Sequence, residues 1–444
     1  MISIGNLQIN KLCLGDVEVT KAYLGDVEVY NSMPQPVEKY MTITVLDGDA
    51  GTTIAPTITG TLSPNLQYRV NNGSWSDFIV GTTADIHVVA GDVVQFKGVN
   101  ESGISDSTQN YLNFAISGNP VALSGNVMSL IDGVGDADVI PCSYCFLNLF
   151  QDTKIKTVTK DFLPATTITS GCYQYMFWRC TSLTQAPELP ATTLYNYCYY
   201  SMFYGCTALT TAPVLPATTL NQGCYQSMFQ GCTALTTAPA LPATTLANLC
   251  YSNMFNGCTA LTTAPELTAT TLSERCYESM FYGCTSLTTA PELPATTLEI
   301  RCYESMFYGC TSLTTAPALS ATTLDSNCYE SMFQGCTSLT TAPELPATTL
   351  SGNCYRQMFQ GCTSLTTAPE LPATRLVIYC YYSMFRGCQN LNYVKCLATN
   401  ISSPSALNNW LDGVASSGTF VKSSGVSYKT GASGIPSGWT VEEI

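Results

Sequence analysis

Cysteine recurs at a constant interval of 26 residues through about half of this sequence. A second series of cysteines follows eight residues behind the first, and the two series together hold 18 of the 22 cysteines. They stand at 172, 198, 224, 250, 276, 302, 328, 354 and 380, and at 180, 206, 232, 258, 284, 310, 336, 362 and 388. A unit this short buries its apolar face only against neighbouring copies. The chain is therefore predicted to form a solenoid with 26-residue coils.

The copy that contains Cys198 indicates what each coil folds into. Leu194, Cys198 and Met202 recur every four residues, which is the spacing of one face of a helix, and Gly205 suits the position just after its end. An extended segment follows, in which Pro213 removes one hydrogen-bond donor from any strand. We therefore predict one helix or helical turn and one short parallel strand in each coil, which makes an α/β solenoid.

The repeat unit also resembles a known family. A Phe-x-x-Cys-x-x-Leu core followed by a Leu-Pro strand is similar to the repeats of BspA-like leucine-rich repeat proteins, which occur on anaerobic bacteria and in phages of anaerobic gut bacteria. In one copy these places are held by Phe203, Cys206, Leu209, Leu215 and Pro216. The resemblance covers about 142–444 and implies a leucine-rich-repeat fold with an adhesion or binding role and no catalytic residues. Because this unit carries an extra cysteine and proline, its coil geometry is expected to differ from that of the other members of the family.

The residues before the repeats indicate separate all-β segments, so the chain is predicted to be multidomain. Residues 12–19 and 23–30 each alternate apolar and polar residues around Gly-Asp, as strand, turn and strand would, and this motif resembles the N-terminal attachment segments of phage virion proteins. Asn72-Gly73 is a hairpin signal among further β-type runs. The predicted segments are a β-type attachment arm (1–31), a linker (32–39), a β-sandwich domain (40–120), a connector with a degenerate capping repeat (121–171), the nine-copy solenoid (172–405) and a C-terminal cap (406–444).

The composition excludes several classes of function. Only 11% of the residues are charged, and the formal net charge is −14, so the chain has no basic surface for a phosphate backbone and nucleic-acid binding is not expected. A single histidine, His87, makes histidine-based triads and histidine-rich metal sites hard to build. No run of 18 apolar residues exists, so no membrane insertion is expected.

The cysteines are expected to be unpaired core residues. Only Cys142 and Cys145 have the C-x2-C spacing of a zinc site, and no second pair accompanies them. We therefore predict no metal and no cofactor, and we interpret both cysteine series as small buried hydrophobic side chains. A disulfide between neighbouring coils stays open as an alternative.

Three columns of the repeat differ from copy to copy, at the positions of 196, 200 and 204. They lie about 200° around a helix from the buried residues, at 100° per residue, and should face solvent. Exposed aromatic side chains among Gln, Asn and Glu suit a glycan- or protein-binding strip, whereas the alternative is a surface that merely tolerates variation. The candidate ligand-binding residues are Trp178, Tyr200, Tyr204, Gln230, Asn256, Glu278, Tyr282, Glu304, Tyr308, Gln334, Gln360 and Arg386.

These observations lead to a phage virion protein of fibre or appendage type as the first hypothesis. Residues 1–31 would dock onto other virion proteins, the β-sandwich would be a spacer, and the solenoid would bind a host-surface glycan or protein. No signal peptide is recognisable at the start of the sequence, and abundant free thiols suit assembly in the reducing host cytoplasm. A homo-oligomer is expected, with a trimer as the working assumption.

Two other hypotheses stay open. One is a bacterial BspA-like adhesin at the cell surface. The other is a surface-glycan depolymerase that would use paired glutamates of the repeat. The first hypothesis and the adhesin are not enzymes.

Overall fold

The N-terminal residues form three short hairpins. The computed structural model describes residues 39–444 throughout and, before them, the backbone of 2–4, 7–9, 13–14, 17–18, 21–24 and 27–31. The antiparallel pairs are β1 (Ile2–Ile4) with β2 (Leu7–Ile9), β3 (Cys13–Leu14) with β4 (Val17–Glu18), and β5 (Lys21–Leu24) with β6 (Val27–Asn31). The predicted β arm is thus present, with one hairpin more than the sequence analysis recognised. Most of the predicted linker lies outside the described residues.

Met1–Lys39 and Tyr40–Ile444 are separate compact units, and the second unit begins with a β-sandwich. One sheet has the strand order β10-β9-β12-β7-β15-β16 and the other β11-β8-β14-β13. The strands are β7 (Met41–Val45), β8 (Thr52–Thr59), β9 (Gln67–Val70), β10 (Ser76–Asp77), β11 (Ile86–Val88), β12 (Val93–Lys97), β13 (Ser105–Ser107), β14 (Asn110–Ser117), β15 (Val121–Ser124) and β16 (Ile155–Val158).

The hairpin between β9 and β10 forms where a turn was expected, but one residue earlier. Asn71 and Asn72 have positive φ angles of 48° and 59°, and the Gly73 N–H donates to the Val70 carbonyl at 2.9 Å. The central residues of the turn are therefore the two asparagines, which tolerate this conformation better than most other residues.

The first sheet runs from the sandwich directly into the repeats. β15 pairs antiparallel with β7 on one side and parallel with β16 on the other, so the predicted domain boundary at residue 120 falls within a continuous sheet. The helices in the described residues are the short α1 (Ser129–Asp132) and the 3-10 turn η1 (Lys160–Phe162), both in this connecting region. The apolar core is also continuous, because Phe114 of the sandwich packs on Phe150 of the first coil at 5.7 Å between ring centroids.

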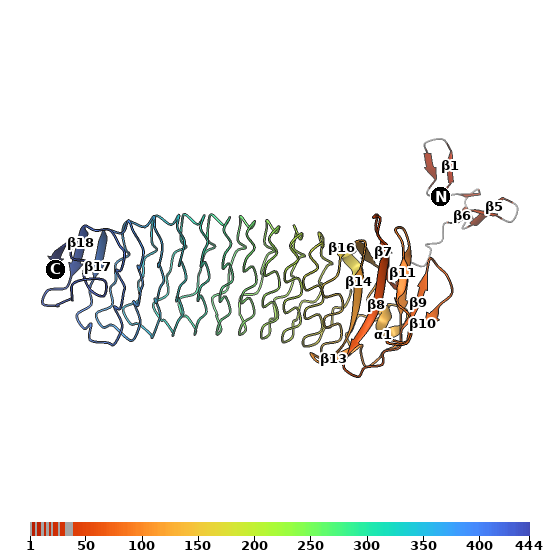
Figure 1. Cartoon of the computed structure of the whole chain (residues 1–444), viewed down its shortest axis with the longest axis horizontal. Helices are drawn as coiled ribbons and strands as arrows, with labels where there is room; N and C mark the ends of the chain where they lie inside the picture. Colours follow the sequence, from red (N-terminus) through yellow and green to blue (C-terminus); the bar gives the residue numbers. More distant parts are fainter. Residues whose placement is uncertain are drawn as a thin grey trace. The chain divides into compact units, whose positions relative to one another are not determined.

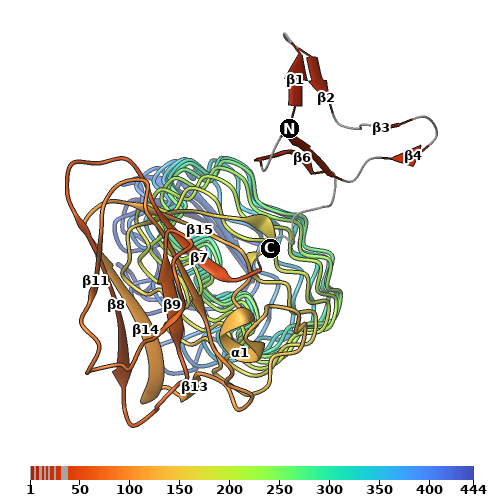
Figure 2. The same cartoon turned by 90° about the vertical axis from the view of Figure 1, so that its right-hand side faces the viewer.

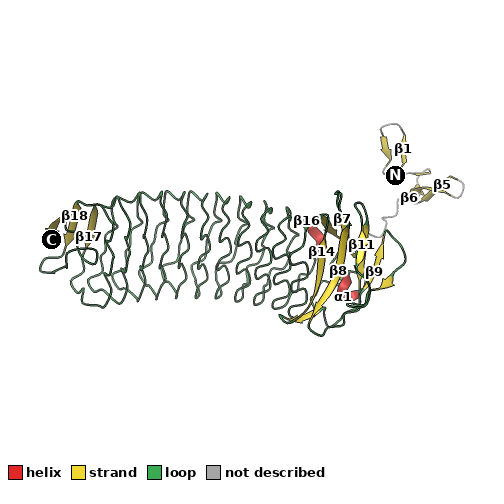
Figure 3. Ribbon diagram, viewed as in Figure 1, coloured by secondary structure: helices red, strands yellow, loops and turns green. Residues whose placement is uncertain are grey.

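The repeats form a stack of coils, and the predicted helix in each coil is wrong. Figures 1 and 3 show the coils as loops with neither helix nor long strand, and Figure 2 shows them overlaid when viewed along the stack. Residues 195–206 are instead a chain of tight turns. The residue in every fourth place is left-handed, with φ of 55° at Tyr197, 50° at Ser201 and 69° at Gly205.

The hydrogen bonds of these turns explain why no helix forms. The Tyr200 N–H donates within its own coil to the Tyr197 carbonyl at 3.1 Å. The Tyr199 N–H donates instead to the Cys224 carbonyl of the next coil at 3.0 Å. This alternation continues along the segment, so every second N–H group donates to a carbonyl of the next coil. An α-helix would keep all of these donors within the segment. The spacing of four residues in the sequence is therefore the period of the turns, which resembles the period of 3.6 of a helix.

The predicted strand of each coil is reduced to single bridges. Thr211, for example, forms a parallel bridge with Thr237. Pro213 follows two residues later and cannot donate, so the ladder stops there. The coils at the two ends carry Thr159 and Lys395 in the place of this proline, and strands β16 and β17 (Tyr393–Cys396) form there.

The core of the stack consists of columns of identical side chains. Tyr199 lies 5.8 Å from Tyr225, and Phe203 lies 5.7 Å from Phe229, with the rings of each pair nearly parallel. The 21 cysteines from Cys142 to Cys396 are free, and all of them except Cys142 are buried. The interpretation of the repeat cysteines as unpaired core residues is therefore confirmed.

The C-terminal end of the stack is closed by a three-stranded parallel sheet. It has the order β17-β18-β19, with β18 at Gly418–Lys422 and β19 at Trp439–Glu443. Trp410 is fully buried and stacks on Tyr381, so it takes the place that a further ladder tyrosine would occupy. Residues 405, 409 and 413 also keep the positive φ angles of the repeat, and one more, degenerate coil therefore precedes the cap.

Candidate binding face

The variable face carries three columns, which pass through Asn196, Tyr200 and Tyr204, and the column through Asn196 is half-buried to exposed along its length. The outer column, through Tyr204, is half-buried to exposed along its length. The inner column, through Tyr200, includes the buried residues Gln174, Ser252 and Glu330. The expectation that this column faces solvent is therefore wrong at these three positions, whereas its other residues, Tyr200 among them, are half-buried.

Four of the twelve candidate residues surround one hollow near the N-terminal end of the stack. The hollow has a volume of about 330 Å³ and takes side chains from four neighbouring coils. We call it the aromatic hollow. It is lined by Asn148, Gln151, Tyr175, Trp178, Tyr200, Ser201, Tyr204, Ser227 and Gln230.

The aromatic rings of this hollow are arranged in two pairs. Trp178 and Tyr204 stack at 5.9 Å with an angle of 23° between their planes. Tyr175 and Tyr200 meet edge to face at 5.2 Å and 79°. Burial, joined by a hydrogen bond with Tyr200, raises the pKa of the Tyr175 hydroxyl well above its ordinary value of 10. The hydroxyl therefore stays neutral at any physiological pH.

The charges next to the aromatic hollow are paired with each other. Arg179 lies over the Trp178 ring at 4.9 Å and forms an ion pair with Asp152 at 3.8 Å. None of the nine residues that line the hollow is charged at neutral pH. The aromatic hollow therefore offers apolar ring faces, amides and hydroxyl groups, but no ionised group.

The other candidate residues lie in separate groups farther along the stack. Tyr282 and Tyr308 stack at 4.4 Å, and the Gln334 amide donates to the Tyr308 hydroxyl at 3.5 Å. The remaining side chains are engaged by their neighbours: the Asn256 amide donates to Asn253 at 2.9 Å, Gln360 accepts from Gln357 at 2.8 Å, and Arg386 pairs with Asp412 at 3.2 Å.

Glu278 and Glu304 belong to a ladder of glutamates and arginines. Arg275 lies 4.0 Å from Glu278, and Arg301 lies 3.4 Å from Glu304. Burial raises the pKa of Glu304 to about 7, and the like charge of Glu330 in the next coil adds to the shift, while Arg301 opposes it. In the described residues, no group of three or more His, Cys, Asp or Glu side chains could hold a metal ion.

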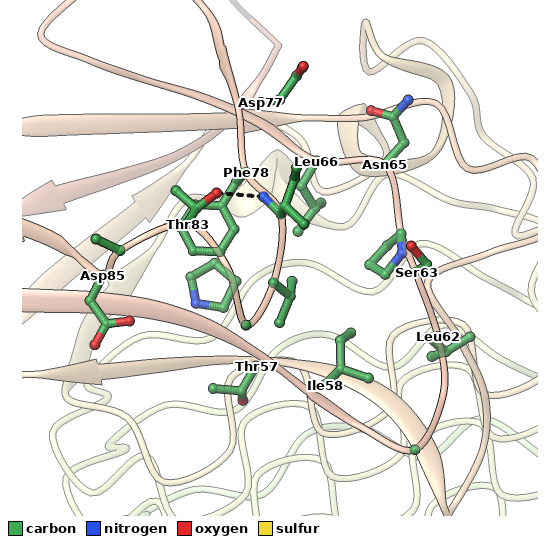
Figure 4. A pocket seen from close by; sticks show the side chains of 17 residues that line it. Thr57, Ile58, Leu62, Ser63, Asn65, Leu66, Asp77, Phe78, Thr83 and Asp85 are labelled. Atoms are coloured by element: carbon green, nitrogen blue, oxygen red, sulfur yellow. Dashed lines mark hydrogen bonds between the residues drawn. The ribbon is translucent and has the colours of Figure 1, made fainter.

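A larger hollow lies in the β-sandwich, between residues 56–66 and 77–85, and has a volume of about 980 Å³ (Figure 4). Its aromatic side chain, Phe78, is buried in the wall, and its charged residues are two aspartates. The Asp77 carboxylate already accepts a hydrogen bond from Gln67 at 2.9 Å. This hollow offers no exposed ring and no convergent set of polar groups, so the aromatic hollow is the better candidate site.

Sequence reasoning missed five of the nine residues around the aromatic hollow. Tyr175, Ser201 and Ser227 belong to the column of left-handed residues, which was assigned to a helix. Asn148 and Gln151 come from the degenerate capping repeat, where they match no residue of the consensus. Aligning this degenerate repeat with the left-handed positions of the other copies would have brought Asn148 into the site.

The model of the BspA type leucine rich repeat region (6 copies) matches residues 143–287, 225–365 and 274–409, which together span more than half of the chain. The chain belongs to the BspA-type leucine-rich repeat family. No curated protein and no solved structure matches it.

The family match confirms the leucine-rich repeats that the resemblance at the Phe, Cys, Leu and Pro positions implied. It begins at residue 143, in the degenerate repeat, and ends at residue 409. Within the described part of the chain, no helix is both long enough and apolar enough to cross a membrane.

Proposed function

We propose that this chain is a surface-adhesin-type binding protein, a leucine-rich-repeat solenoid whose variable face holds a partner at a cell surface. One observation carries the proposal: Trp178, Tyr200, Tyr204 and Gln230, from three neighbouring coils, line a single hollow with partly exposed rings. Aromatic side chains bury much surface with few rotatable bonds, and they therefore dominate many binding sites.

The proposed role is binding without catalysis. The glutamates that the depolymerase hypothesis would use are all exposed, on the side of the coil that carries Thr211: Glu188, Glu266, Glu292, Glu344 and Glu370. Two of them already contact lysines, since Glu188 lies 3.7 Å from Lys160 and Glu370 lies 2.8 Å from Lys395. A glycosidase instead needs a carboxyl group whose pKa is raised by an enclosed pocket.

The test is the binding of the fluorescently labelled full chain to a panel of intact bacterial and epithelial cells, measured by flow cytometry. The double variant Trp178→Ala/Tyr204→Ala should bind at least about tenfold more weakly, because it removes the stacked ring pair. The matched control Thr237→Ala/Thr263→Ala changes two exposed side chains elsewhere on the coils and should bind as the unmodified chain does. Equal binding by the two double variants, or binding to no cell type, would refute the proposal.

A placement of this binding protein on a virus particle is the more specific form of the proposal. It is supported by the separate N-terminal unit, whose three hairpins provide a segment for attachment to other virion proteins. The chain should then co-purify with particles, and deletion of residues 1–31 should release it while leaving residues 40–444 folded. Retention of the shortened chain on particles would argue against this role of the arm.

A further inference from the structure

We infer that the aromatic hollow binds a neutral sugar ring of a cell-surface glycan. This inference rests on the proposed function and adds the chemical class of the ligand. It starts from the absence of ionised groups among the nine lining residues. A site for a phosphate, a carboxylate or a basic peptide would present at least one opposite charge, whereas this site presents amides, hydroxyl groups and rings.

The shape of the ring pairs suits a sugar. A sugar ring has an apolar face of C–H groups and an edge of hydroxyl groups. Because Trp178 and Tyr204 stack on each other, they offer to the C–H face the ring surface that they do not cover for one another. The perpendicular pair of Tyr175 and Tyr200 stands beside that surface. The volume of about 330 Å³ lies at the small end of the range for small-molecule sites, which is about 300–1,000 Å³, and fits a short saccharide unit better than a folded partner.

The polar atom that points to a hydroxyl-bearing ligand is the side-chain oxygen of Asn148. Asn148 is only 8% exposed, and its Oδ1 atom is buried with no hydrogen-bond partner. The nearby amide of Gln151 donates to Asp152 at 3.3 Å instead. Buried polar atoms without a partner are rare in folded proteins, and a ligand hydroxyl that reached this oxygen would supply the missing hydrogen bond.

Another coil provides an internal comparison for this oxygen. Asn253 occupies the same left-handed column, and both asparagines have a φ of 57°. The Oδ1 atom of Asn253 accepts a hydrogen bond from Asn256 at 2.9 Å. The unpaired oxygen is thus not a general property of asparagine in this column, and it occurs where the aromatic rings surround a hollow.

The experiment separates a sugar from a protein partner on the cells that bind the full chain. The cells are treated either with periodate, which cleaves the vicinal diols of sugars, or with a protease, and the full chain is also applied to a microarray of neutral oligosaccharides. Periodate should abolish binding, protease should leave most of it, and the array should show binding to a subset of the oligosaccharides. Trp178→Ala should lower the affinity for these oligosaccharides at least about tenfold.

Asn148→Gly tests the buried oxygen, because glycine adopts the same φ without strain. It should weaken oligosaccharide binding about three- to tenfold. The control variant Asn253→Gly should leave this binding unchanged. Equal melting temperatures would show that both variants fold. Binding that resists periodate, is lost with protease and still depends on Trp178 would overturn the sugar inference while the proposed function stands. Binding that does not depend on Trp178 would overturn both.

Discussion

The second cysteine of each coil links that coil to its neighbour through a hydrogen bond. The Cys206 thiol donates to the Phe177 carbonyl of the preceding coil at 3.1 Å, and the same contact recurs in eight further coils. The sequence alone predicted correctly that these thiols are buried and unpaired. It could not predict the hydrogen bond, because the accepting carbonyl lies 29 residues away and comes close only through the stacking of the coils.

The thiols should differ sharply in reactivity. Burial raises the pKa of the Cys284 thiol and shields it, whereas a hydrogen bond from Cys145 lowers the pKa of the half-buried Cys142. We expect a maleimide reagent to modify Cys142 of the native protein faster than any cysteine in the range 172–388. Mass spectrometry of peptides after timed labelling would check this order, with labelling in denaturant as the control. Equal rates across the repeats would show that the coils open readily.

Glu304 should make stability depend on pH. Its pKa rises to about 7 in the fold from an ordinary value of 4.5, so the folded state binds more protons than the unfolded state between these two values. The free energy of unfolding therefore contains a contribution that falls as the pH rises through this window. Glu304→Gln should remove that slope and stabilise the protein at pH 8 by about 1–2 kcal/mol.

Thermal unfolding of the two forms from pH 4.5 to pH 8 measures this effect. Glu292→Gln is the control, because Glu292 is exposed and its carboxylate remains in water. A Glu304→Gln variant with an unchanged pH profile would mean that the glutamate and arginine ladder already satisfies this carboxylate.

The structural unit of the repeat stack is the 26-residue coil, which is neither a helix nor a strand. Its length and its buried columns follow from the sequence, since Cys, Met, Tyr and Phe recur at fixed places and all of them are buried. The backbone conformation of the coil does not follow from the sequence, because apolar residues at a spacing of four fit both a helix and a series of tight turns. The distinction depends on donors such as the Tyr199 N–H, which bonds to the next coil. The aromatic hollow could not be predicted from the sequence either, because two of its lining residues, Asn148 and Gln151, come from a degenerate repeat.

Removal of one whole coil should preserve the fold. Deletion of residues 264–289 joins equivalent positions of neighbouring copies and keeps every column in register. The shortened chain should unfold cooperatively, with stability lower by about 1–4 kcal/mol, and should keep its aromatic hollow. Deletion of residues 264–276 alone removes half a coil, breaks the tyrosine ladder and should prevent folding. Circular dichroism during heating distinguishes the two variants, and similar unfolding of both would contradict the coil as the unit.

At the scale of the whole molecule, the β-sandwich closes the N-terminal end of the stack. Strand β15 extends the sheet into β16 of the first coil, and Phe114 continues the column of phenylalanines that begins at Phe150. A repeat array needs such a cap, because an open end would expose its apolar columns to water. The sequence indicated a cap, but it placed the cap in the degenerate repeat alone.

Two truncations test the sandwich as a cap. Deletion of residues 1–39 removes a separate compact unit and should change the melting temperature of the rest by no more than about 1 °C. Deletion of residues 1–124 uncovers β16 and Phe150 and should cause aggregation or a large loss of stability. Calorimetry with light scattering measures both, and a stable, soluble 125–444 fragment would show that the coils need no sandwich.

The donors that alternate between coils also determine how the stack bears mechanical load. The residues at the positions of Tyr197, Tyr199, Ser201, Phe203 and Gly205 each donate to the next coil, so every interface between coils is held by a row of parallel hydrogen bonds. Tension between the sandwich end and the C-terminal cap stretches each row as a unit, while successive interfaces act in series. A tethered chain under flow would therefore lengthen in steps of one coil, each releasing roughly 90 Å of extended backbone, and would dissipate force before its attachment fails.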